Sequence, residues 1–552
     1  MLLAVFQAII ATKEIGRQHK RIGKPPARDT PAMQRVECDY LVVGSGAASL
    51  AFVDTLLDEL PEARVVLVDK KPCPGGHWVD AYGFVRLHQP SIVYGLASAS
   101  LEGSWAKLLV TKRILPWKHR ASKAEITQYF QKFVDAKTAS GQLQYFPECV
   151  FDLGQELKAS ASNAKSVTAA FASLDGKRRY TAEIREKLVD GVRGECLIPS
   201  RNPPEFPVAE GIHLITPNEL QRLSTGRGQK EKHFVVLGAG KTAMDTVVFL
   251  QTALKVPSTN ISWVISNDVW MLSRENSGGP FDYQRALLEA DNDKDKACLA
   301  MEADGKFVRL EPGVLPTRFR FPMIGKDEVK LMRRVEEKIR RGRVASLGVE
   351  DGDVVVRFEE EGREDWVLPR EGDKEYVFVH CTSPGPFNGK PSDDVVFQSE
   401  RNMTLDLLYA PPISISMSCV AKLESATKKG TLNVALGRAL LNNDAATPNE
   451  ILRQLIRGLG IQSTDATPGF LDGMRSAITQ ASFLALLDAD PMVGYRWLKA
   501  NRLSMFSVPG FKGSVVEDME AIVAKGRILG APPAQLNIIR KIAEHLEPLR
   551  GK

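Results

Sequence analysis

The sequence is poor in the residues that build metal sites and disulfide frameworks. Its 552 residues contain seven cysteines and eight histidines. The cysteines are odd in number and scattered without a C-x-x-C pair, and the histidines form no H-E-x-x-H pair. These patterns argue against structural zinc, a dithiol redox centre and a metalloprotease site. Free cysteines are typical of a reducing compartment, so we expect a cytoplasmic protein that needs no metal.

Long apolar runs and a strong excess of one charge are also missing. The opening run MLLAVFQAIIAT is too short to span a bilayer, so we expect no membrane span and interpret it as a helix packed on the body. Of the net charge of +6, much lies in residues 1–37, which hold seven Lys or Arg and three Asp or Glu. The rest is near neutral, so no nucleic-acid partner is expected. The basic segment is either a solvated tail or an address signal.

A nucleotide-triphosphate P-loop is excluded too. The stretch FVVLGAGKTAMD at residues 234–245 contains the Gly-Lys-Thr of a P-loop, but the pattern G-x-x-x-x-G-K-[ST] needs a glycine where this chain has Val235. Two glycines, two positions apart, instead follow an apolar strand and precede a small alanine, as in a dinucleotide-binding turn. The expected cofactor contacts of this turn are Gly238, Gly240, Lys241 and Thr242.

An earlier stretch, DYLVVGSGAASL at residues 39–50, contains a turn of the same kind. An apolar strand runs into two glycines and an alanine-rich helix, so a pyrophosphate can approach the unpaired N–H groups at the helix N-terminus. A second apolar strand, ARVVLVD, ends at an aspartate placed to accept hydrogen bonds from ribose hydroxyls. The expected cofactor contacts of this unit are Gly44, Gly46, Ala47, Ala48, Ser49, Asp69 and Lys70.

Two dinucleotide turns in one chain are the layout of flavoproteins that bind FAD in one domain and a nicotinamide in another. We therefore predict an α/β fold with two Rossmann-type dinucleotide-binding domains, one inserted in the other, plus a C-terminal helical region. The strand in 375–386 is expected to re-enter the first domain after the insertion. The predicted divisions are a basic N-terminal segment (1–37), an FAD-binding domain (38–210 and 371–440), an NAD(P)-binding-like domain (211–370) and a helical cap or packing region (441–552).

Three further segments carry element predictions. Ser122 and Glu125 form a capping box that begins a core helix in residues 120–136. Residues 344–368 alternate like an antiparallel meander with a Gly-Asp turn. Residues 326–343 read as a strongly charged helix, whose basic residues are either a solvated face or a phosphate site.

The stretch GGHWVDAYGFVRLHQPSIVY, residues 75–94, resembles the class B flavoprotein monooxygenases, the Baeyer–Villiger and N-hydroxylating group. Members of that group have GGxW shortly after the ribose-binding acid, then a tyrosine, an arginine, a Pro-Ser pair and a tyrosine at this spacing. The resemblance covers the FAD half, roughly residues 38–210, and the general layout to about residue 440, and it implies FAD as cofactor. The matching residues are Gly75, Gly76, Trp78, Tyr82, Arg86, Pro90, Ser91 and Tyr94.

The same stretch supplies candidates for the flavin site. The glycine pair lets the backbone lie close to the cofactor, Trp78 offers a rigid apolar wall, and the next turn would bring Arg86 and His88 toward the isoalloxazine ring as candidate catalytic residues. Alternatively, Trp78 and Tyr82 are core aromatics and Arg86 belongs to a surface ion pair. The expected cofactor contacts here are Gly76, His77, Trp78, Arg86, His88 and Gln89.

Three departures from the family pattern bear on the reaction. His88 stands where Baeyer–Villiger enzymes place an aspartate, and we expect Arg86 to keep its imidazole neutral. The fingerprint FxGxxxHxxx[FY] is absent before the second turn. After the next strand, Asp268 would repel a 2′-phosphate whereas Lys241 and Arg274 would attract it, so NADPH and NADH both stay open.

The function predicted from these features is an FAD-dependent oxidoreductase, a monooxygenase that uses NAD(P)H and oxygen on a small organic substrate. One alternative is an FAD-dependent oxidase or dehydrogenase with a vestigial nicotinamide domain, and another is a non-enzymatic flavin-binding protein. Cys381 is either a nucleophile or a small buried residue. The C-terminal helices either cap a substrate cleft or form a packing or homodimerisation surface.

Overall fold

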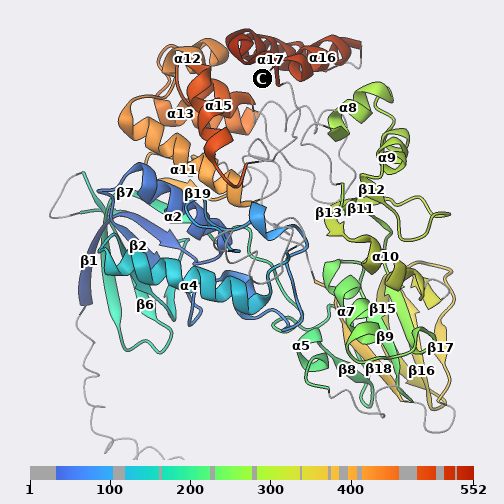
Figure 1. Cartoon of the computed structure of the whole chain (residues 1–552). Coiled ribbons are helices and arrows are strands. Elements are labelled where there is room, and N and C mark those ends of the chain that lie inside the picture. Colours follow the sequence, from blue (N-terminus) through green and yellow to red (C-terminus); the bar gives the residue numbers. More distant parts are fainter. Residues whose placement is uncertain are drawn as a thin grey trace, which may run out of the picture.

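A computed structural model shows a mixed α/β molecule with parallel sheets and a helical C-terminal part (Figure 1), which confirms the predicted α/β class. Residues 1–32, which include the expected N-terminal helix and most of the basic segment, lie outside the described residues. The structure describes residues 33–102, 119–160, 165–223, 231–276, 282–335, 338–370, 375–383, 396–406, 413–458, 481–504, 515–528 and 531–551.

The first sheet has eight strands and is parallel around its centre. Its central strands have the order β3-β2-β1-β7 and pair in parallel, while β6, β4 and β5 extend it antiparallel and β19 pairs in parallel with β7. The strands are β1 (Met33–Val43), β2 (Val65–Val68), β3 (Leu143–Phe146), β4 (Cys149–Phe151), β5 (Lys158–Ala159), β6 (Val167–Ser173), β7 (Arg179–Asp190) and β19 (Asn402–Thr404).

Helices α2 (Ala47–Glu59), α4 (Lys123–Ala139) and α11 (Ile413–Lys429) belong to this part of the molecule. The predicted capping box at the start of α4 is confirmed, because the Ser122 side chain accepts from the backbone N–H of Glu125 and the Glu125 side chain accepts from that of Ser122. The helix that begins at the first turn, α2, packs against α11 and is apolar on most of its surface, so it is buried from both sides.

The second sheet has five strands, all parallel, in the order β14-β10-β9-β18-β8. The prediction that the strand in 375–386 re-enters the first domain is wrong: β18 is a central strand here, paired with β9 and β8. Its sequence YVFVH is buried throughout, which suits a strand flanked on both edges. The chain returns to the first sheet later, at β19. The strands are β8 (His213–Ile215), β9 (His233–Leu237), β10 (Ile261–Ile265), β14 (Ile339–Arg341) and β18 (Tyr376–His380).

The charged segment at residues 326–343 is helical only in its first half. Helix α10 covers Lys326–Arg333, and β14 follows as the edge strand beside β10, with Ile339 opposite Trp263. The single long helix predicted from the charge pattern is therefore wrong. Ile339 is buried, so an edge position on the sheet removes more apolar surface from water than a further turn of a solvated helix.

The predicted meander is confirmed as three antiparallel strands, β15 (Val344–Glu350), β16 (Asp353–Phe358) and β17 (Trp366–Leu368). Its first turn contains Asp351 and Gly352 with φ of +50° and +90°, as a two-residue hairpin loop requires. Helices α5 (Pro217–Leu220) and α7 (Lys241–Thr252) complete this part.

An insertion follows β10 and forms its own small unit. Its three-stranded sheet carries two helices, which pack on it through a separate aromatic core. The elements are β11 (Val269–Ser273), α8 (Asp282–Glu289), α9 (Lys294–Ala303), β12 (Phe307–Val308) and β13 (Arg318–Ile324).

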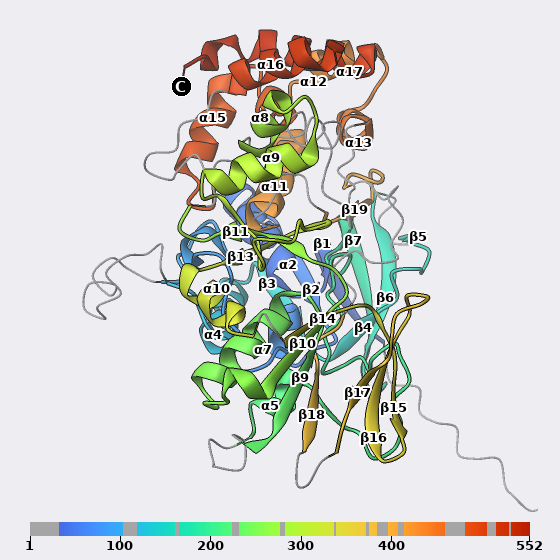
Figure 2. The same ribbon diagram turned by 90° about the vertical axis from the view of Figure 1, so that its right-hand side faces the viewer.

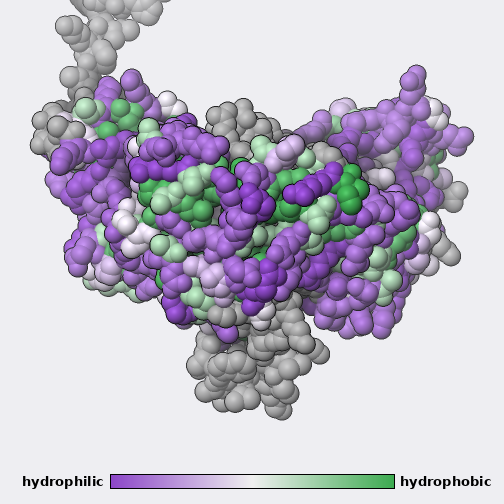
Figure 3. All heavy atoms as spheres, turned by 90° about the horizontal axis from the view of Figure 1, so that it is seen from above, coloured by the Kyte–Doolittle hydropathy of each residue, from purple (hydrophilic) through white to green (hydrophobic). Residues whose placement is uncertain are grey.

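The C-terminal part is helical, as expected, and lies above both sheets in Figures 1 and 2. Its buried residues form one continuous hydrophobic cluster with those of α2 and α11, whereas the second sheet has separate clusters. Seen from above, the surface is mainly hydrophilic, with hydrophobic residues gathered along its middle (Figure 3). Across the described residues, no helix combines the length and apolar character needed to cross a bilayer. The helices are α12 (Val434–Leu441), α13 (Pro448–Gly458), α15 (Pro491–Ala500), α16 (Val515–Ile528) and α17 (Pro533–His545).

Candidate functional site

The first dinucleotide turn joins β1 to α2. Gly44 has φ of +92°, and a Cβ atom at this position would stand 2.6 Å from Val192 Cγ1. Gly46 is the N-cap of α2 and offers no side chain to the first N–H groups of the helix. Those donors therefore remain for an anion, since an uncapped helix N-terminus leaves up to four N–H groups without a partner in the helix.

Asp69 lies beside this turn, directly after β2. Its carboxylate accepts from the backbone N of Ser45 at 2.5 Å, from Ser45 Oγ at 2.7 Å and from the backbone N of Lys71 at 2.8 Å. A carboxylate has about four acceptor positions, so the three protein donors fix its orientation and leave capacity for a ribose hydroxyl. The two predicted parts of the unit, glycine turn and acid, are brought together.

The glycine pair of residues 75–76 packs on the same turn. The Gly75 N–H donates to Ser45 O at 2.8 Å, and a Cβ on Gly76 would stand 2.8 Å from Gly46 Cα. Only glycine permits this approach of two backbones, as the sequence predicted. Of the other expected contacts, Ala47 and Ala48 are half-buried, Ser49 is buried, His77 is exposed, and exposed Lys70 pairs with Glu195 at 2.9 Å.

Trp78 lies in the hydrophobic core and not on an open wall. Its indole N–H donates to Tyr94 Oη at 2.7 Å, and the two rings meet edge to face with centroids 6.2 Å apart. Both side chains belong to the buried cluster shared by α2 and the C-terminal helices. The packing alternative for Trp78 therefore describes its contacts in this structure.

The second turn joins β9 to α7 with similar geometry. Gly238 has φ of +129°, and a Cβ there would lie 3.0 Å from the backbone of Cys381, so glycine is required. Gly240 is the N-cap of α7 without a side-chain cap, and a Cβ on it would meet nothing within 4 Å. Lys241 and Thr242 are half-buried in the first turn of α7. A dinucleotide phosphate needs open space of this kind before the first N–H groups of a helix.

Four other helices begin with a side-chain cap, whereas α10 begins at a glycine, Gly325, as α2 and α7 do. Helices α4, α9, α12 and α15 begin at a Ser, Asp or Asn whose side chain accepts from the first turn. Such a cap consumes the donors that an anion would use. The glycine starts of α2 and α7 forgo that stabilisation, which is typical of a ligand site.

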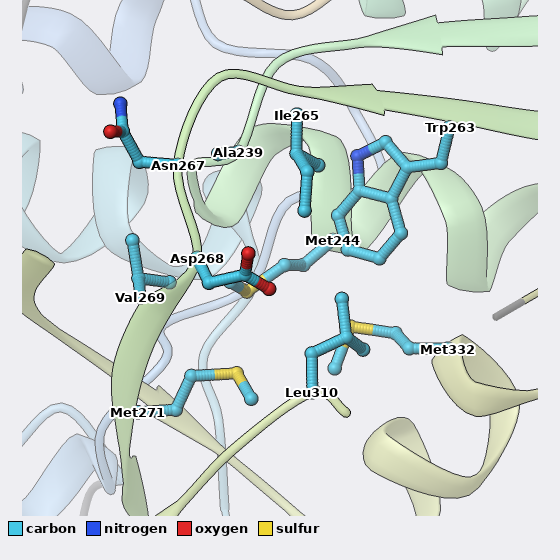
Figure 4. A pocket seen from close by; sticks show the side chains of 10 residues that line it. All are labelled: Ala239, Met244, Trp263, Ile265, Asn267, Asp268, Val269, Met271, Leu310 and Met332. Carbon is cyan, nitrogen blue, oxygen red and sulfur yellow. The ribbon is translucent and has the colours of Figure 1, made fainter. Parts of the chain in front are cut away.

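A small pocket lies at the carboxyl ends of β9 and β10, and the Asp268 carboxylate points into it (Figure 4). Its space is about 10 Å³, room for roughly one water molecule, so it is too small to enclose a nucleotide. Arg341 holds Asp268 through two hydrogen bonds of 2.8 and 3.2 Å. The lining residues are Ala239, Met244, Trp263, Ile265, Asn267, Asp268, Val269, Met271, Leu310 and Met332.

The segment from Tyr82 to His88 connects the two halves of the molecule, the one built around the first sheet and the one built around the second. Tyr82 Oη donates to Asp245 on α7 at 2.9 Å, and the Phe84 ring stacks on Phe249 of the same helix with centroids 3.9 Å apart. From the family resemblance, we expected this segment to turn toward a flavin. Its side chains instead make their described contacts at the junction of the two sheets.

His88 reaches the insertion from this segment. Its Nδ1 accepts from the backbone N of Met323 at 3.3 Å, so the ring proton is on Nε2, and its carbonyl accepts from Arg274 Nε at 2.8 Å. Burial, followed by the charges of Lys241, Arg274 and Arg120, lowers the pKa of His88 to about 4. The imidazole is neutral at pH 7, as predicted, but Arg86 is not the cause.

The other two candidates from the stretch 75–94 are Arg86 and Gln89. Arg86 is exposed, and its Nη1 donates to Arg120 O at 3.1 Å. Gln89 is half-buried, with Oε1 buried and without a protein partner among the described residues. No contact of either residue tests its proposed approach to a flavin ring, so both stay predictions.

Sequence reasoning missed the residue at the centre of the junction, Glu328 on α10. Its carboxylate receives Arg274 at 2.7 Å, Arg120 at 3.1 Å and Lys241 at 3.4 Å, and also the backbone N–H of Gly325 at 3.0 Å. Burial alone would raise the pKa of Glu328, but the three cations and the N–H lower it to about 2. We call Glu328 with Arg120, Lys241 and Arg274 the Glu328 cluster.

The Glu328 cluster changes two earlier predictions. Lys241 and Arg274 were expected to attract a 2′-phosphate, but both are paired with carboxylates, Lys241 also with Asp245. The basic residues of 326–343 were read as a solvated face or a phosphate site, whereas the acidic Glu328 in that segment is the buried member. The spacing of residues could not predict the ion pairs of Glu328, because its partners lie 54 to 208 positions away in the sequence.

Cys381 lies in the same region, against Thr246 of α7. Burial raises the pKa of the Cys381 thiol to about 12, and the residue is buried against Thr246, so the structure favours the packing alternative over a nucleophile. All seven cysteines are free. Among the residues with described positions, no three His, Cys, Asp or Glu side chains gather as a metal site would require.

Comparisons with curated proteins place the chain near one flavoenzyme. No family model matches the chain. It is 32% identical over 327 residues to uncharacterized proteins of Mycobacterium bovis and Mycobacterium tuberculosis, covering 56% of this chain and 56% of each relative. It is 27% identical over 252 residues to the FAD-dependent monooxygenase resA of Aspergillus sclerotiorum, covering 44% of this chain and 38% of that protein. The chain spans about half the length of the curated relatives it matches first, and the predicted resemblance to flavoprotein monooxygenases is confirmed.

Solved structures similar to this chain are flavin-dependent monooxygenases too. A polycyclic ketone monooxygenase of Thermothelomyces thermophila aligns with a TM-score of 0.46 at 10% identity, over 91% of this chain and 90% of that one. The FAD-bound cadaverine monooxygenase DfoA of Erwinia amylovora gives 0.44 at 11%, over 71% and 94%. An ornithine N-hydroxylase of Kutzneria sp. 744 gives 0.40 at 12%, over 63% and 81%.

Proposed function

We propose that this protein is an FAD-dependent monooxygenase that takes electrons from a reduced nicotinamide and uses oxygen on a small organic substrate. The observation that carries the proposal is the pair of glycine-started, uncapped helices, α2 and α7, each at the end of a strand that pairs in parallel with its neighbours. Dinucleotides bind at such helix N-termini, and two sites in one chain serve two cofactors. The relative resA supports FAD as one of them.

FAD fits the first turn on the chemistry of its residues. Gly44 and Gly46 leave room and free N–H groups for a pyrophosphate, and Asp69 is oriented by Ser45 and Lys71 to accept from a ribose. Bound FAD would supply the two-electron chemistry and the activation of oxygen that side chains lack. The chain's share is to hold the cofactor and to exclude water around the reacting atoms.

The second turn is proposed to hold the nicotinamide cofactor through Gly238, Gly240, Lys241 and Thr242. Gly240 has open space before it, so phosphates can approach the start of α7. The division of the chain follows from the sheets: residues 38–210 with β19 serve FAD, and residues 211–383, which include β18, serve the nicotinamide. This moves the earlier boundary at residue 371 beyond β18.

His88 is proposed to adjust the electrostatics where the two cofactors meet. A neutral imidazole with its proton on Nε2 can donate a hydrogen bond without adding a charge. The Glu328 cluster supplies the fixed charges around it and ties the second half to Arg120 of the first. Arg86 is retained as a candidate because its exposed guanidinium is not paired with a carboxylate among the described ion pairs.

Matched substitutions in the two turns test the proposal. The purified protein should be yellow and contain FAD, and anaerobic NADH or NADPH should bleach it. Gly46→Val should abolish retention of FAD, whereas Gly240→Val should keep FAD and lose reduction by nicotinamides. Full retention of FAD by Gly46→Val would falsify the first site.

The remaining outcomes separate the alternative functions. If FAD binds but neither nicotinamide reduces it, while an organic substrate does, the protein is an oxidase or dehydrogenase. If no reductant or substrate reacts with the bound flavin, it is a non-enzymatic flavoprotein. Consumption of oxygen with formation of an oxygenated product, coupled to nicotinamide oxidation, is the result that the monooxygenase proposal requires.

A further inference from the structure

The edge of the second sheet carries an unusual charge pattern beside the α7 turn. Asp268 follows β10, the second strand of this unit, and its carboxylate points into the pocket of Figure 4. Arg341 on β14 binds Asp268 through two hydrogen bonds and also binds Glu311 at 2.6 Å. The Asp268 side chain lines the pocket and is 10% exposed, and that of Arg341 is 34% exposed.

This group of three, which we call the Asp268 triad (Asp268, Glu311 and Arg341), has two carboxylates and one guanidinium. Both carboxylates lower the energy of the charged arginine and raise its pKa, so the group keeps a net charge of −1 at neutral pH. The cations of the Glu328 cluster are directed elsewhere, because Arg274 binds Glu328 and Lys241 binds Glu328 and Asp245. Among the described ion pairs, Asp268 therefore has Arg341 as its cation, and that cation is shared with a second carboxylate.

We propose that the Asp268 triad selects NADH over NADPH. In dinucleotide-binding units an acid after the second strand accepts from the ribose 2′-hydroxyl, whereas a 2′-phosphate needs a free arginine. A phosphate monoester carries a charge of about −1.5 to −2 at pH 7 and would meet two carboxylates around an arginine that they already occupy. The inference rests on the proposed nicotinamide site and specifies its ligand.

The first experiment measures binding and not turnover. Dissociation constants for NAD+ and NADP+ are determined by isothermal titration calorimetry on the purified, FAD-loaded protein. NAD+ should bind at least about tenfold more tightly than NADP+, because one adverse charge at close range is worth more than a factor of ten at low ionic strength. The difference should shrink as salt is added.

Two substitutions locate the cause in the triad. Asp268→Asn removes the carboxylate that lines the pocket. It should weaken the binding of NAD+ and strengthen the binding of NADP+, so that the ratio of the two dissociation constants approaches one. Glu311→Gln leaves Asp268 in place as the acceptor for the ribose hydroxyl and should strengthen the binding of NADP+ alone. Asp304→Asn removes an exposed carboxylate of the insertion, 64% exposed and paired with Lys306, and should change neither constant.

Each outcome decides one question. Tighter binding of NADP+ to the wild type, or an unchanged ratio in both triad variants, would overturn the inference and leave the proposed nicotinamide site standing. Failure of both nucleotides to bind any variant would instead reject the nicotinamide site itself. Thermal melting of each variant verifies that it folds, so loss of binding is not mistaken for loss of structure.

Discussion

At the scale of single residues, Glu328 has the largest electrostatic role in the junction between the two sheets. One carboxylate, 11% exposed, faces three cations from three separate elements and one backbone N–H. Removing one partner of a buried ion pair is costly because the remaining charges stay desolvated. Arg120 comes from the first half and Lys241 and Arg274 from the second, so the loss would loosen the contact between the halves.

Glu328→Gln should lower the free energy of unfolding by about 3 kcal/mol at pH 7, the cost of breaking a buried ion pair. The pKa of Glu328 falls from the ordinary 4.5 to about 2, so its contribution is complete above pH 4.5 and is lost as the pH falls toward 2. Urea unfolding of both proteins between these limits should show the difference shrinking. Asp327→Asn, 97% exposed on the same helix, is the control and should be neutral; a constant difference at all pH values would contradict the assignment.

His88 gives a second prediction at this scale. Since its pKa is about 4, the rate of flavin reduction should show no inflection from this group between about pH 5 and 8. His88→Gln keeps an acceptor for the Met323 N–H and should slow reduction little. His88→Asp brings another carboxylate among the cations of the Glu328 cluster and should slow it roughly tenfold. Stopped-flow rates in anaerobic buffer are the measurement, and equal rates in all three proteins would make His88 a packing residue.

The residues that sequence reasoning found share one property: their role follows from the local chain. Gly44, Gly46 and Asp69 belong to one strand–helix–strand unit, so their spacing predicted their meeting. Glu328 and Arg341 act through partners far away in the sequence, and a single sequence carries no periodicity for such contacts. The neutrality of His88 was predicted, but its causes, burial first and then the charges of Lys241 and Arg274, belong to this second class.

At the scale of elements, the conformation of the first dinucleotide turn depends on the close meeting of two strands and one helix. The end of β1, the end of β7 and the start of α2 approach so closely that Gly191 N donates to Val43 O at 2.9 Å. A Cβ on Gly191 would stand 1.9 Å from Ser49 Oγ and 2.7 Å from Val43 O. The second contact is with backbone, which cannot move without shifting a central strand.

Gly191→Ala should therefore destabilise the protein by about 2 kcal/mol, as overpacking of a close contact does, and should weaken FAD retention through the displaced turn. Gly313→Ala is the matched change at an open position, where a Cβ would meet nothing within 4 Å, and should be neutral. Thermal melting and the flavin-to-protein absorbance ratio measure the two effects. Equal stability of the two variants would show that the contact relaxes freely.

Element predictions succeeded where a local rule decided and failed where a tertiary contact did. The capping box of α4 and the meander β15–β17 follow from neighbouring residues, and both are confirmed. The charged segment at 326–343 has mostly helix-forming residues, yet residues 339–341 pair with β10 because an open sheet edge lies beside them. The strand at 375–386 was identified correctly as a strand, but its sequence does not say which sheet it joins.

At the scale of the whole molecule, the C-terminal helices connect the two halves. Their core residues are continuous with those of α2 and α11, so they pack on the first half. Arg502 from this part donates to the carbonyls of Ile92 at 2.9 Å and Leu96 at 2.5 Å, at the end of the stretch 75–94 and directly after it. The opposite end of the same helical part reaches the insertion of the second half, where α16 contacts α8 (Figure 2). The packing alternative for these helices is thereby supported.

The α8–α16 contact depends on one bidentate ion pair. Arg285 on α8 binds both oxygens of Asp518 on α16, at 2.7 and 2.9 Å, and the Asp518 side chain is 11% exposed. Lys525 and Asp291 form a second pair across the same contact, but the Asp291 side chain is 73% exposed. Exposed pairs contribute little, whereas a partly buried bidentate pair holds its geometry.

Asp518→Asn should consequently release α8 while α16 stays in place. The amide hydrogens of residues 282–289 should exchange about tenfold faster, since a charge-assisted hydrogen-bonded pair contributes at least 1.4 kcal/mol to local closure. Those of α16 should change little, because Val516, Met519 and Ile522 keep it in the core shared with α2. Lys525→Ala is the control that removes only the exposed pair and should leave both helices protected. Hydrogen exchange read by mass spectrometry resolves the two helices, and equal acceleration of α8 in both variants would show that general charge at this contact, and not the Arg285–Asp518 geometry, joins the two halves.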